Sequence, residues 1–332
     1  MRAILIKDGS GPAENLYLGE EVTPSPGKGE VQVKIKTFGL NRMDILQREG
    51  KYPLPPKASK TILGVEFAGV ISEVGEGCGR KVGEEVFGLA YGGAYAEYIV
   101  CPEVMLITKP QELSWVEAAA LPECWMTAFQ ALFVEGSFKK GQTALIHAGA
   151  SGVGVAAIQL AIHVGGAEKV FSTCGTDEKV DFLHRLHPDK VVAINYRKQN
   201  FEEEIKKHTD GVDHIIDFVG RNYFTSNISL LRRDGTLIFL ALLSGPTLAE
   251  GTNISPILYK RLTLRGTTLR SRDENYQGNL LGRFRDEALP LIVKGEMKVE
   301  VHEVFDWKDV RKAHEEMEAN KNSGKIVFEI TE

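Results

Sequence analysis

A glycine-rich segment between two apolar runs constrains this sequence more than any other feature. Residues 143–161, TALIHAGASGVGVAAIQLA, begin as a short β-type run, turn through several glycines and continue as an apolar helical stretch. A strand, a glycine turn and a helix in this order present backbone N–H groups to a pyrophosphate. A Cβ in such a turn would hold the phosphate away from those donors. A tight turn that binds nothing has the same local pattern, so the surrounding chain must decide between the two interpretations.

Strand-like and helical runs alternate regularly from residue 143 to residue 243. The strand-like runs are 143–148, 169–173, 190–194, 213–218 and 236–242, and the helical runs are 152–164, 178–186, 201–208 and 222–232. This alternation is typical of an α/β fold with a doubly wound parallel sheet. The glycine turn is then the first crossover of that sheet, which favours the phosphate-binding interpretation.

The first part of the chain has a different pattern. Residues 31–38 alternate apolar and polar side chains, and short β-like runs with glycine turns fill 63–88 and 91–100. Many short strands with glycine corners predict a small, closed or nearly closed β-domain. No long helix is expected before Ser114, which forms a capping box with Glu117.

The C-terminal segment is expected to return to the first domain. It carries a strand at 262–266, helices near 276–293 and 307–319, and a last strand at 325–330. We therefore predict two domains. The predicted boundaries are 1–122 plus 290–332 for the β-domain and 123–289 for the nucleotide-binding domain.

Composition excludes several classes of protein. The chain has 332 residues, a formal net charge of −5 and no basic excess that would favour nucleic acid. The first residues, MRAILIKDG, are too short an apolar run for a signal peptide, and no run is long enough for a membrane span. Four dispersed cysteines, without a CxxC pair, indicate neither disulfides nor a zinc knot. We predict a reduced, cytoplasmic protein without membrane or nucleic-acid partners.

The sequence resembles the medium-chain dehydrogenase/reductase superfamily, in its zinc-free quinone oxidoreductase (zeta-crystallin-like) branch. Within that branch it is most similar to the tumour-suppressor-inducible quinone oxidoreductase subgroup. The resemblance covers nearly the whole chain and implies a Rossmann domain, a GroES-like β-domain, NADPH as cofactor and a homodimer. The motifs that carry it are LNRMD (40–44), GVEFAGVISEVG (64–75), AALPECWMTAFQAL (119–132), HAGASGVGVAAIQLA (147–161), NY (195–196), IIDFVG (215–220), LRSRDENY (269–276) and EANKNSGKIV (318–327).

Two departures from the zinc-dependent relatives bear on metal binding. Those relatives have a cysteine ligand where this chain has Asn41 and a histidine where it has Val65. Zinc requires three or four nitrogen, thiolate or carboxylate ligands, and the expected ones are missing. The lobe of four closely spaced cysteines is missing as well. We predict no metal.

The choice between NAD and NADP depends on the end of the second strand of the parallel sheet. An acidic residue there accepts hydrogen bonds from the ribose hydroxyls of NAD. Asp177 lies just beyond that strand and Lys179 follows, so the residues alone leave both cofactors open. The resemblance implies that Lys179 and Tyr196 contact the 2′-phosphate of NADPH. The alternatives are that Lys179 is only an exposed helix lysine and that Tyr196 is only a packed loop aromatic.

The resemblance also implies further cofactor contacts. Ser151 replaces a glycine common in the branch, and its hydroxyl is expected to donate to the pyrophosphate. Packing for Thr127 and a surface charge for Arg270 are the alternatives left open. The predicted cofactor-binding residues are Tyr52, Thr127, Gly149, Ser151, Gly152, Val153, Gly154, Lys179, Tyr196, Val219, Leu242, Ser244, Leu269, Arg270 and Asn322.

Hydride transfer to a quinone needs a flat acceptor over the nicotinamide and donors to its oxygens. The predicted donors are the amide of Asn41 and the phenol of Tyr52. The alternatives are that Asn41 is only a turn residue and that Tyr52 is only a packed loop aromatic. The predicted function is NADPH-dependent quinone reduction. An alkenal or enone double-bond reductase and a low-turnover, NADPH-binding structural or RNA-binding crystallin-type protein are the alternatives.

Overall fold

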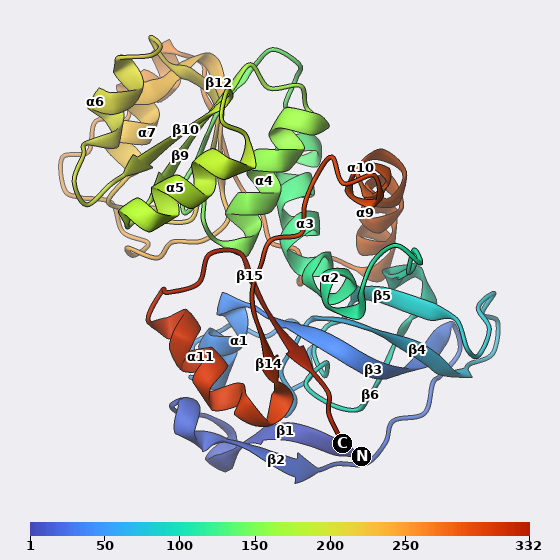
Figure 1. The fold of residues 1–332 in the computed structure, drawn as a ribbon. Helices are drawn as coiled ribbons and strands as arrows, with labels where there is room; N and C mark the ends of the chain where they lie inside the picture. Colours follow the sequence, from blue (N-terminus) through green and yellow to red (C-terminus); the bar gives the residue numbers. More distant parts are fainter. The chain divides into compact units, whose positions relative to one another are not determined.

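The computed structural model describes residues 1–332 (Figure 1). The chain divides into two compact units, each considered by itself below. The first comprises Met1–Met126 and Leu269–Glu332, and the second comprises Thr127–Thr268. The division falls within α3 (Pro122–Phe129) on one side and just before Leu269 on the other.

The second unit is built on a parallel sheet of six strands. These are β8 (Thr143–Ile146), β9 (Lys169–Cys174), β10 (Val191–Asn195), β11 (Val212–Asp217), β12 (Leu231–Phe239) and β13 (Thr263–Gly266). Their order, β10-β9-β8-β11-β12-β13, is that of a Rossmann fold, with the reversal between β8 and β11. The predicted α/β fold class is confirmed.

Helices connect these strands, as the crossovers of a parallel sheet require. They are α4 (Gly152–His163), α5 (Asp177–Leu186), α6 (Phe201–Lys206), α7 (Phe224–Leu230) and α8 (Ser255–Tyr259), and a π-helical turn, Gln130–Val134, continues α3. Helix α4 is buried from Gly154 to Ile162, which explains why its sequence has almost no polar face. Leu145, Phe171 and Ile215 belong to the apolar core beneath the sheet.

The first unit contains a seven-strand sheet in the order β14-β15-β3-β4-β5-β7, with β6 paired to β3. Its strands are β3 (Glu30–Leu40), β4 (Glu66–Val74), β5 (Glu85–Leu89), β6 (Tyr98–Pro102), β7 (Leu106–Thr108), β14 (Val301–Asp306) and β15 (Lys325–Glu329). A separate hairpin pairs β1 (Arg2–Ile6) with β2 (Leu16–Glu20). The short strands and glycine corners expected from the sequence are all in this unit.

Five further helices complete the first unit. They are α1 (Arg42–Arg48), α2 (Trp115–Ala120), α9 (Glu274–Glu287), α10 (Leu289–Val293) and α11 (Val310–Glu318). The capping box predicted for Ser114 and Glu117 is present at the start of α2. Helix α1 was not predicted, because its seven residues are too few for a clear helical period.

The segment from residue 262 returns to the first unit later than expected. Its first strand, β13, joins the parallel sheet beside β12, and the return begins only at Leu269. Helix α9 then packs on β7 within the first unit. The division at Leu269 thus falls between residue 262, where the sequence pattern of this segment begins, and residue 290, where the predicted domain begins; the predicted domain boundaries stay a prediction.

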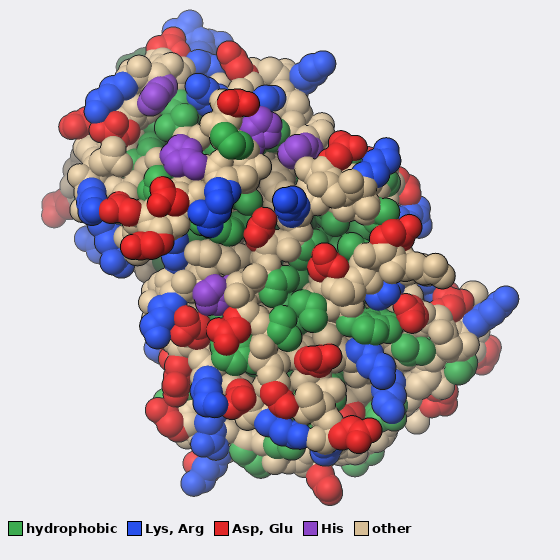
Figure 2. Space-filling view, viewed as in Figure 1, with side chains coloured by type: hydrophobic (Ala, Val, Ile, Leu, Met, Phe, Trp, Pro, Cys, Tyr) green, Lys and Arg blue, Asp and Glu red, His purple; other side chains and the backbone are tan.

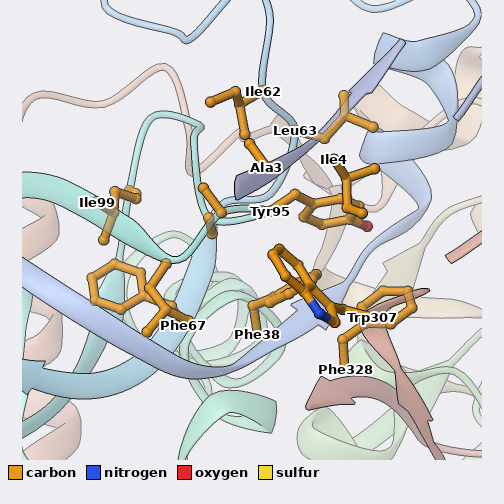
Figure 3. Close-up of a cluster of buried hydrophobic side chains, with 14 of the residues drawn as sticks. Ala3, Ile4, Phe38, Ile62, Leu63, Phe67, Tyr95, Ile99, Trp307 and Phe328 are labelled. Carbon is orange, nitrogen blue, oxygen red and sulfur yellow. The ribbon is translucent and has the colours of Figure 1, made fainter. Parts of the chain in front are cut away.

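Aromatic side chains from distant parts of the sequence fill the core of the first unit (Figure 3). The ring of Phe38 lies 4.6 Å from that of Tyr95 and 4.8 Å from that of Phe328. Trp307 is fully buried beside them, with the guanidinium of Arg2 5.3 Å from its ring centre. This packing joins the C-terminal strands to the N-terminal β-domain.

Two global features of the structure bear on partners. No helix has both the length and the apolar character needed to cross a membrane. On the face of the molecule in Figure 2, basic and acidic side chains are intermixed, without a stripe of one sign.

Candidate functional site

The glycine turn after β8 is held by the hydroxyl group of Ser151. Its Oγ accepts a hydrogen bond from the backbone N–H of Gly154 at 3.1 Å and donates to the carbonyl oxygen of Ala148 at 2.7 Å. Ser151 is therefore the N-cap of α4, a role that stabilises a helix start by about 1 kcal/mol. In this arrangement the hydroxyl hydrogen is directed at Ala148, so its donation to a pyrophosphate stays a prediction.

The glycines of the turn are required by close packing. An added Cβ at Gly149 would lie 1.8 Å from Oγ of Ser172 on β9, and one at Gly154 would lie 2.5 Å from the carbonyl oxygen of Ala148. The turn therefore lies directly against the neighbouring strand at the start of a twelve-residue helix. This arrangement, which also contains Gly152 and Val153, fits a pyrophosphate group.

Charged side chains surround the end of β9, where the adenosine of a dinucleotide binds in this fold. The carboxylate of Asp177 accepts a hydrogen bond from the Asn195 amide at 2.7 Å and forms an ion pair with Lys198. These contacts occupy the acid that sequence reasoning considered for the ribose of NAD. Lys179, in the first turn of α5, is half-buried. Tyr196, directly after β10, is 43% exposed.

The structure adds cationic residues that the sequence reasoning did not select. Lys198 carries the ion pair with Asp177, and Arg197 approaches Gly175 at the end of β9. An added Cβ at Gly175 would lie 3.0 Å from the Tyr196 hydroxyl and 3.5 Å from Nε of Arg197. Their position beside Tyr196 in the sequence is a signal that would have found both.

The loops after β11 and β12 are joined by hydrogen bonds. The backbone N–H and the hydroxyl of Ser244 both donate to the carbonyl oxygen of Val219, at 2.9 and 2.7 Å. Gly220 has φ +80° and leaves no room for a Cβ beside Leu242. The structure thus brings together three predicted cofactor residues, Val219, Leu242 and Ser244, at the rim where Rossmann sheets bind ligands.

A hydrogen-bonded polar network without an ion pair lies beneath this rim. The Asn227 amide donates to Asp217 at 3.1 Å and is 2.8 Å from Nε2 of His147, whose Nδ1 is 3.0 Å from the Thr173 hydroxyl. Burial lowers the pKa of His147 to about 4, so its ring is neutral. Burial raises the pKa of Asp217 to about 6. The backbone N–H of Val219 donates to Asp217, so the network holds the loop after β11.

In the first unit, a buried ion pair lies where β3, β4 and β15 meet. Nζ of Lys325 is 2.5 Å from Oε1 of Glu66, and the two side chains are 4% and 0% exposed. An added Cβ at Gly39 would lie 2.3 Å from the same oxygen, so this glycine makes space for the pair. Burial disfavours the ammonium ion, but the nearby Cys124 and Glu66 raise the pKa of Lys325 above its usual value.

Asn41 is bound into this pair. Its amide N–H donates to Glu66 at 2.7 Å, and its side-chain oxygen accepts from Lys325 at 2.6 Å. Asn41 is also the N-cap of α1, because its backbone N–H donates to the carboxylate of Asp44. One of the two amide hydrogens predicted to serve a substrate is therefore already engaged.

Arg270 is buried, so the alternative of a surface charge is wrong. Its Nη1 donates to the side-chain oxygen of Gln47 at 2.8 Å, and its Nε and Nη2 donate to the carbonyl oxygen of Tyr91. The guanidinium lies 5.4 Å from the ring centre of Tyr52. Burial and the neighbouring Glu123 raise the pKa of Tyr52, which keeps the phenol protonated.

The remaining predicted residues are placed as follows. Leu269 is buried beside Arg270 in the sequence, and Thr127 is half-buried on α3. Asn322 is 9% exposed and donates to the carbonyl oxygen of Gly324 just before β15. The roles of these three residues toward a cofactor stay predictions.

The residues around Glu66 do not fit a zinc ion. No three histidine, cysteine, aspartate or glutamate side chains are grouped closely enough to hold a metal. The Lys325 ammonium instead contacts Glu66, Asn41 and the thiol of Cys124, with Nζ 3.5 Å from Sγ. A divalent cation placed there would meet a buried positive charge and lack the nitrogen and thiolate ligands that zinc requires.

Comparison with known proteins agrees with this geometry. Residues 27–111 match the alcohol dehydrogenase GroES-like domain, and residues 152–284 match the zinc-binding dehydrogenase domain. The synaptic vesicle membrane protein VAT-1 homolog of Rattus norvegicus is 30% identical over 325 residues, covering 92% of this chain and 78% of that protein.

Two solved structures are similar over their whole length. The quinone oxidoreductase of Escherichia coli, complexed with NADPH, is 29% identical with a TM-score of 0.86, covering 99% of this chain and 100% of that one. The CurK enoyl reductase is 27% identical with a TM-score of 0.85, covering 99% of each chain. The chain belongs to the medium-chain dehydrogenase/reductase superfamily, in its zinc-free quinone oxidoreductase branch. It is an oxidoreductase of that family.

Proposed function

We propose that this protein is an NADPH-dependent reductase of quinones. The observation that carries the proposal is the engagement of Asp177 by Lys198 and Asn195. Because this carboxylate already has two partners, and Lys179 and Arg197 are near the end of β9, this end of the sheet favours the 2′-phosphate of NADPH. The similar Escherichia coli quinone oxidoreductase is complexed with NADPH, which supports the same cofactor.

The residues of this chain have separate tasks in the proposed reaction. The turn at Gly149–Gly154 and the start of α4 bind the pyrophosphate, and Lys179 and Tyr196 bind the 2′-phosphate. When bound, the nicotinamide supplies a hydride. Tyr52, whose raised pKa keeps it protonated, donates a hydrogen bond to an acceptor oxygen, and the free amide hydrogen of Asn41 donates another.

Reduction of an α,β-unsaturated carbonyl compound is the second candidate. A donor to the carbonyl oxygen polarises an enone in the same way as a quinone, so Tyr52 and Asn41 serve both acceptors. Similarity to the CurK enoyl reductase favours this candidate. The low-turnover, nucleic-acid-binding alternative is disfavoured, because the formal net charge is −5 and the face in Figure 2 has intermixed charges.

The proposed assembly is a homodimer. Strand β13 is the edge of the parallel sheet and pairs only with β12, so its other side has free backbone groups. Just before it, Ile254, Leu258 and Tyr259 are 60%, 74% and 72% exposed. Pairing of β13 across a two-fold axis would cover both features. The cytoplasmic location and the proposed subgroup are further predictions that follow from the sequence.

The proposal is tested by measuring oxidation of NADPH and of NADH with 1,2-naphthoquinone, 1,4-benzoquinone and a small enone. We expect turnover with NADPH and quinones and weak turnover with NADH. Faster enone reduction would favour the second candidate, and equal use of NADH would contradict the role given to Lys179. Tight NADPH binding without turnover of any acceptor would favour a non-catalytic protein.

A further inference from the structure

One buried carboxyl group has no partner and no role in the function proposed above. Glu123 is the second residue of α3, and its backbone N–H donates to Oε2 of Glu66 at 2.7 Å. The residue is only 8% exposed, yet its side-chain oxygens take part in no hydrogen bond or ion pair. Its oxygens are not among the fully enclosed unpaired atoms of the protein, so they border accessible space in which a small molecule can contact them. Buried polar side chains are nearly always hydrogen-bonded, so a carboxyl group that lacks a protein partner and borders such space is a candidate for contact with a ligand.

Titratable groups surround Glu123, and the cations among them are engaged elsewhere. The surrounding groups are Glu66 on β4, Lys325 on β15, Asp44 on α1, Arg270 before α9, Tyr52 after α1 and the thiol of Cys124. The nearest cations are committed, because Lys325 pairs with Glu66 and Arg270 binds Gln47 and Tyr91. Burial and the negative charge of Glu66 outweigh them and raise the pKa of Glu123 to about 8. The group is a neutral carboxylic acid at neutral pH.

We propose that Glu123 is a catalytic proton donor of this site and delivers its carboxyl hydrogen to the acceptor after hydride transfer. This inference rests on the proposed function, since it completes that reaction. A quinone or enone that has taken a hydride carries a negative charge on oxygen. The O–H bond of Glu123 breaks, an O–H bond forms on the acceptor, and Glu123 is left as a carboxylate. Solvent then returns a proton to the carboxylate.

The neighbouring groups are poorer proton donors. The pKa of Tyr52 is raised, so its phenol donates a hydrogen bond but does not release a proton easily. Burial raises the pKa of Cys124 to about 12, and the thiol contacts Lys325. An acid is most effective when its pKa is near the working pH, which among these groups is true of Glu123.

Replacement of Glu123 by glutamine tests the proposal, because the amide keeps the shape of the side chain and removes the proton. We expect the E123Q variant to bind NADPH with unchanged affinity and to lose about 10²-fold or more in kcat. The wild-type kcat should fall above about pH 8, and this break should be absent from the variant. Glu123→Asp, which restores a carboxyl, should recover part of the rate. Glu112→Gln, in an exposed turn, is the control.

A second measurement reports the proton directly. The infrared carbonyl band of a protonated carboxylic acid should be present in the cofactor-free wild type at neutral pH. It should titrate near pH 8 and be absent from E123Q. A wild-type band identical to that of the variant would overturn the proposal, as would unchanged kcat and an unchanged pH profile in E123Q.

Different results would contradict the proposed function and the role of Glu123. A wild type that reduces neither quinone nor enone with NADPH overturns the proposed function and, with it, the role of Glu123. An active wild type with an equally active E123Q variant overturns the role of Glu123 alone. Thermal unfolding of each variant establishes that a lost rate does not reflect a lost fold.

Discussion

Each of the two units contains a buried polar network, and only the network of the first unit contains an ion pair. In the second unit, Asn227 connects a neutral His147 to Asp217 beneath the cofactor rim. In the first unit, Glu66 and Lys325 form an ion pair around which Asn41 and Glu123 are arranged. The hydrogen-bonded network of the second unit has partners for all its members and holds loops in position. The charged network includes Glu123, which has no partner and is therefore available for chemistry.

The charged network should be the more sensitive to loss of one member. Lys325→Met leaves Glu66 buried without a counter-charge, which costs about 3–5 kcal/mol of unfolding free energy. Denaturant unfolding measures this cost, with the exposed Lys321→Met as the control. The double variant Lys325→Met/Glu66→Gln should recover much of the loss. A cost below about 1 kcal/mol would contradict the view that the pair is tightly coupled.

The pH dependence of the unfolding free energy should reveal the ionisation of Glu123. Its folded pKa, about 8, is above its usual value of 4.5, so the wild type loses stability as pH rises through this range. E123Q lacks this loss, and its unfolding free energy relative to wild type should increase by on the order of 3 kcal/mol between about pH 5 and about pH 8. The measurement is urea unfolding at both pH values. A constant difference would mean that Glu123 is ionised throughout.

The hydrogen-bonded network of the second unit should give the smallest effect. Asn227→Leu leaves Nε2 of His147 without its partner and removes one of the two hydrogen bonds to Oδ2 of Asp217, at a cost of about 1–3 kcal/mol. Added salt should change this cost little, because no ion pair is broken. Asn279→Leu, on the exposed face of α9, is the control for the same change of side chain. A cost as large as that of Lys325→Met would remove the distinction between the networks.

Local patterns predicted the fold, and long-range contacts determined the site. The alternating strands and helices and the glycine turn are visible in short windows, so the Rossmann sheet was confirmed. The Glu66–Lys325 pair joins residues far apart in the sequence, and no window contains both. Glu123 follows a proline at a helix start, where an acidic residue is ordinarily explained by the helix dipole. A lysine beginning the otherwise apolar strand 325–328 was the available signal.

Other differences have similarly physical causes. The sequence left two interpretations of Arg270, a surface charge or a site residue. Only its contacts with Gln47 and Tyr91 show that it is buried. The sequence could not decide whether Asp177 binds the ribose of NAD or Lys179 binds the 2′-phosphate of NADPH. The answer depends on the ion pair of Asp177 with Lys198, which lies beyond the next strand. In both cases the identity of the residue was visible, but its partner was not.

The counter-charge of Glu66 is part of the polypeptide itself. Lys325 is synthesised with the chain, so this centre is complete as soon as the last strand joins the sheet, without a separate step of metal loading. Such a centre is therefore unaffected by chelators, by zinc scarcity or by competition among metal ions. A chain truncated before β15 would lose both a strand of the sheet and the cation that pairs with Glu66.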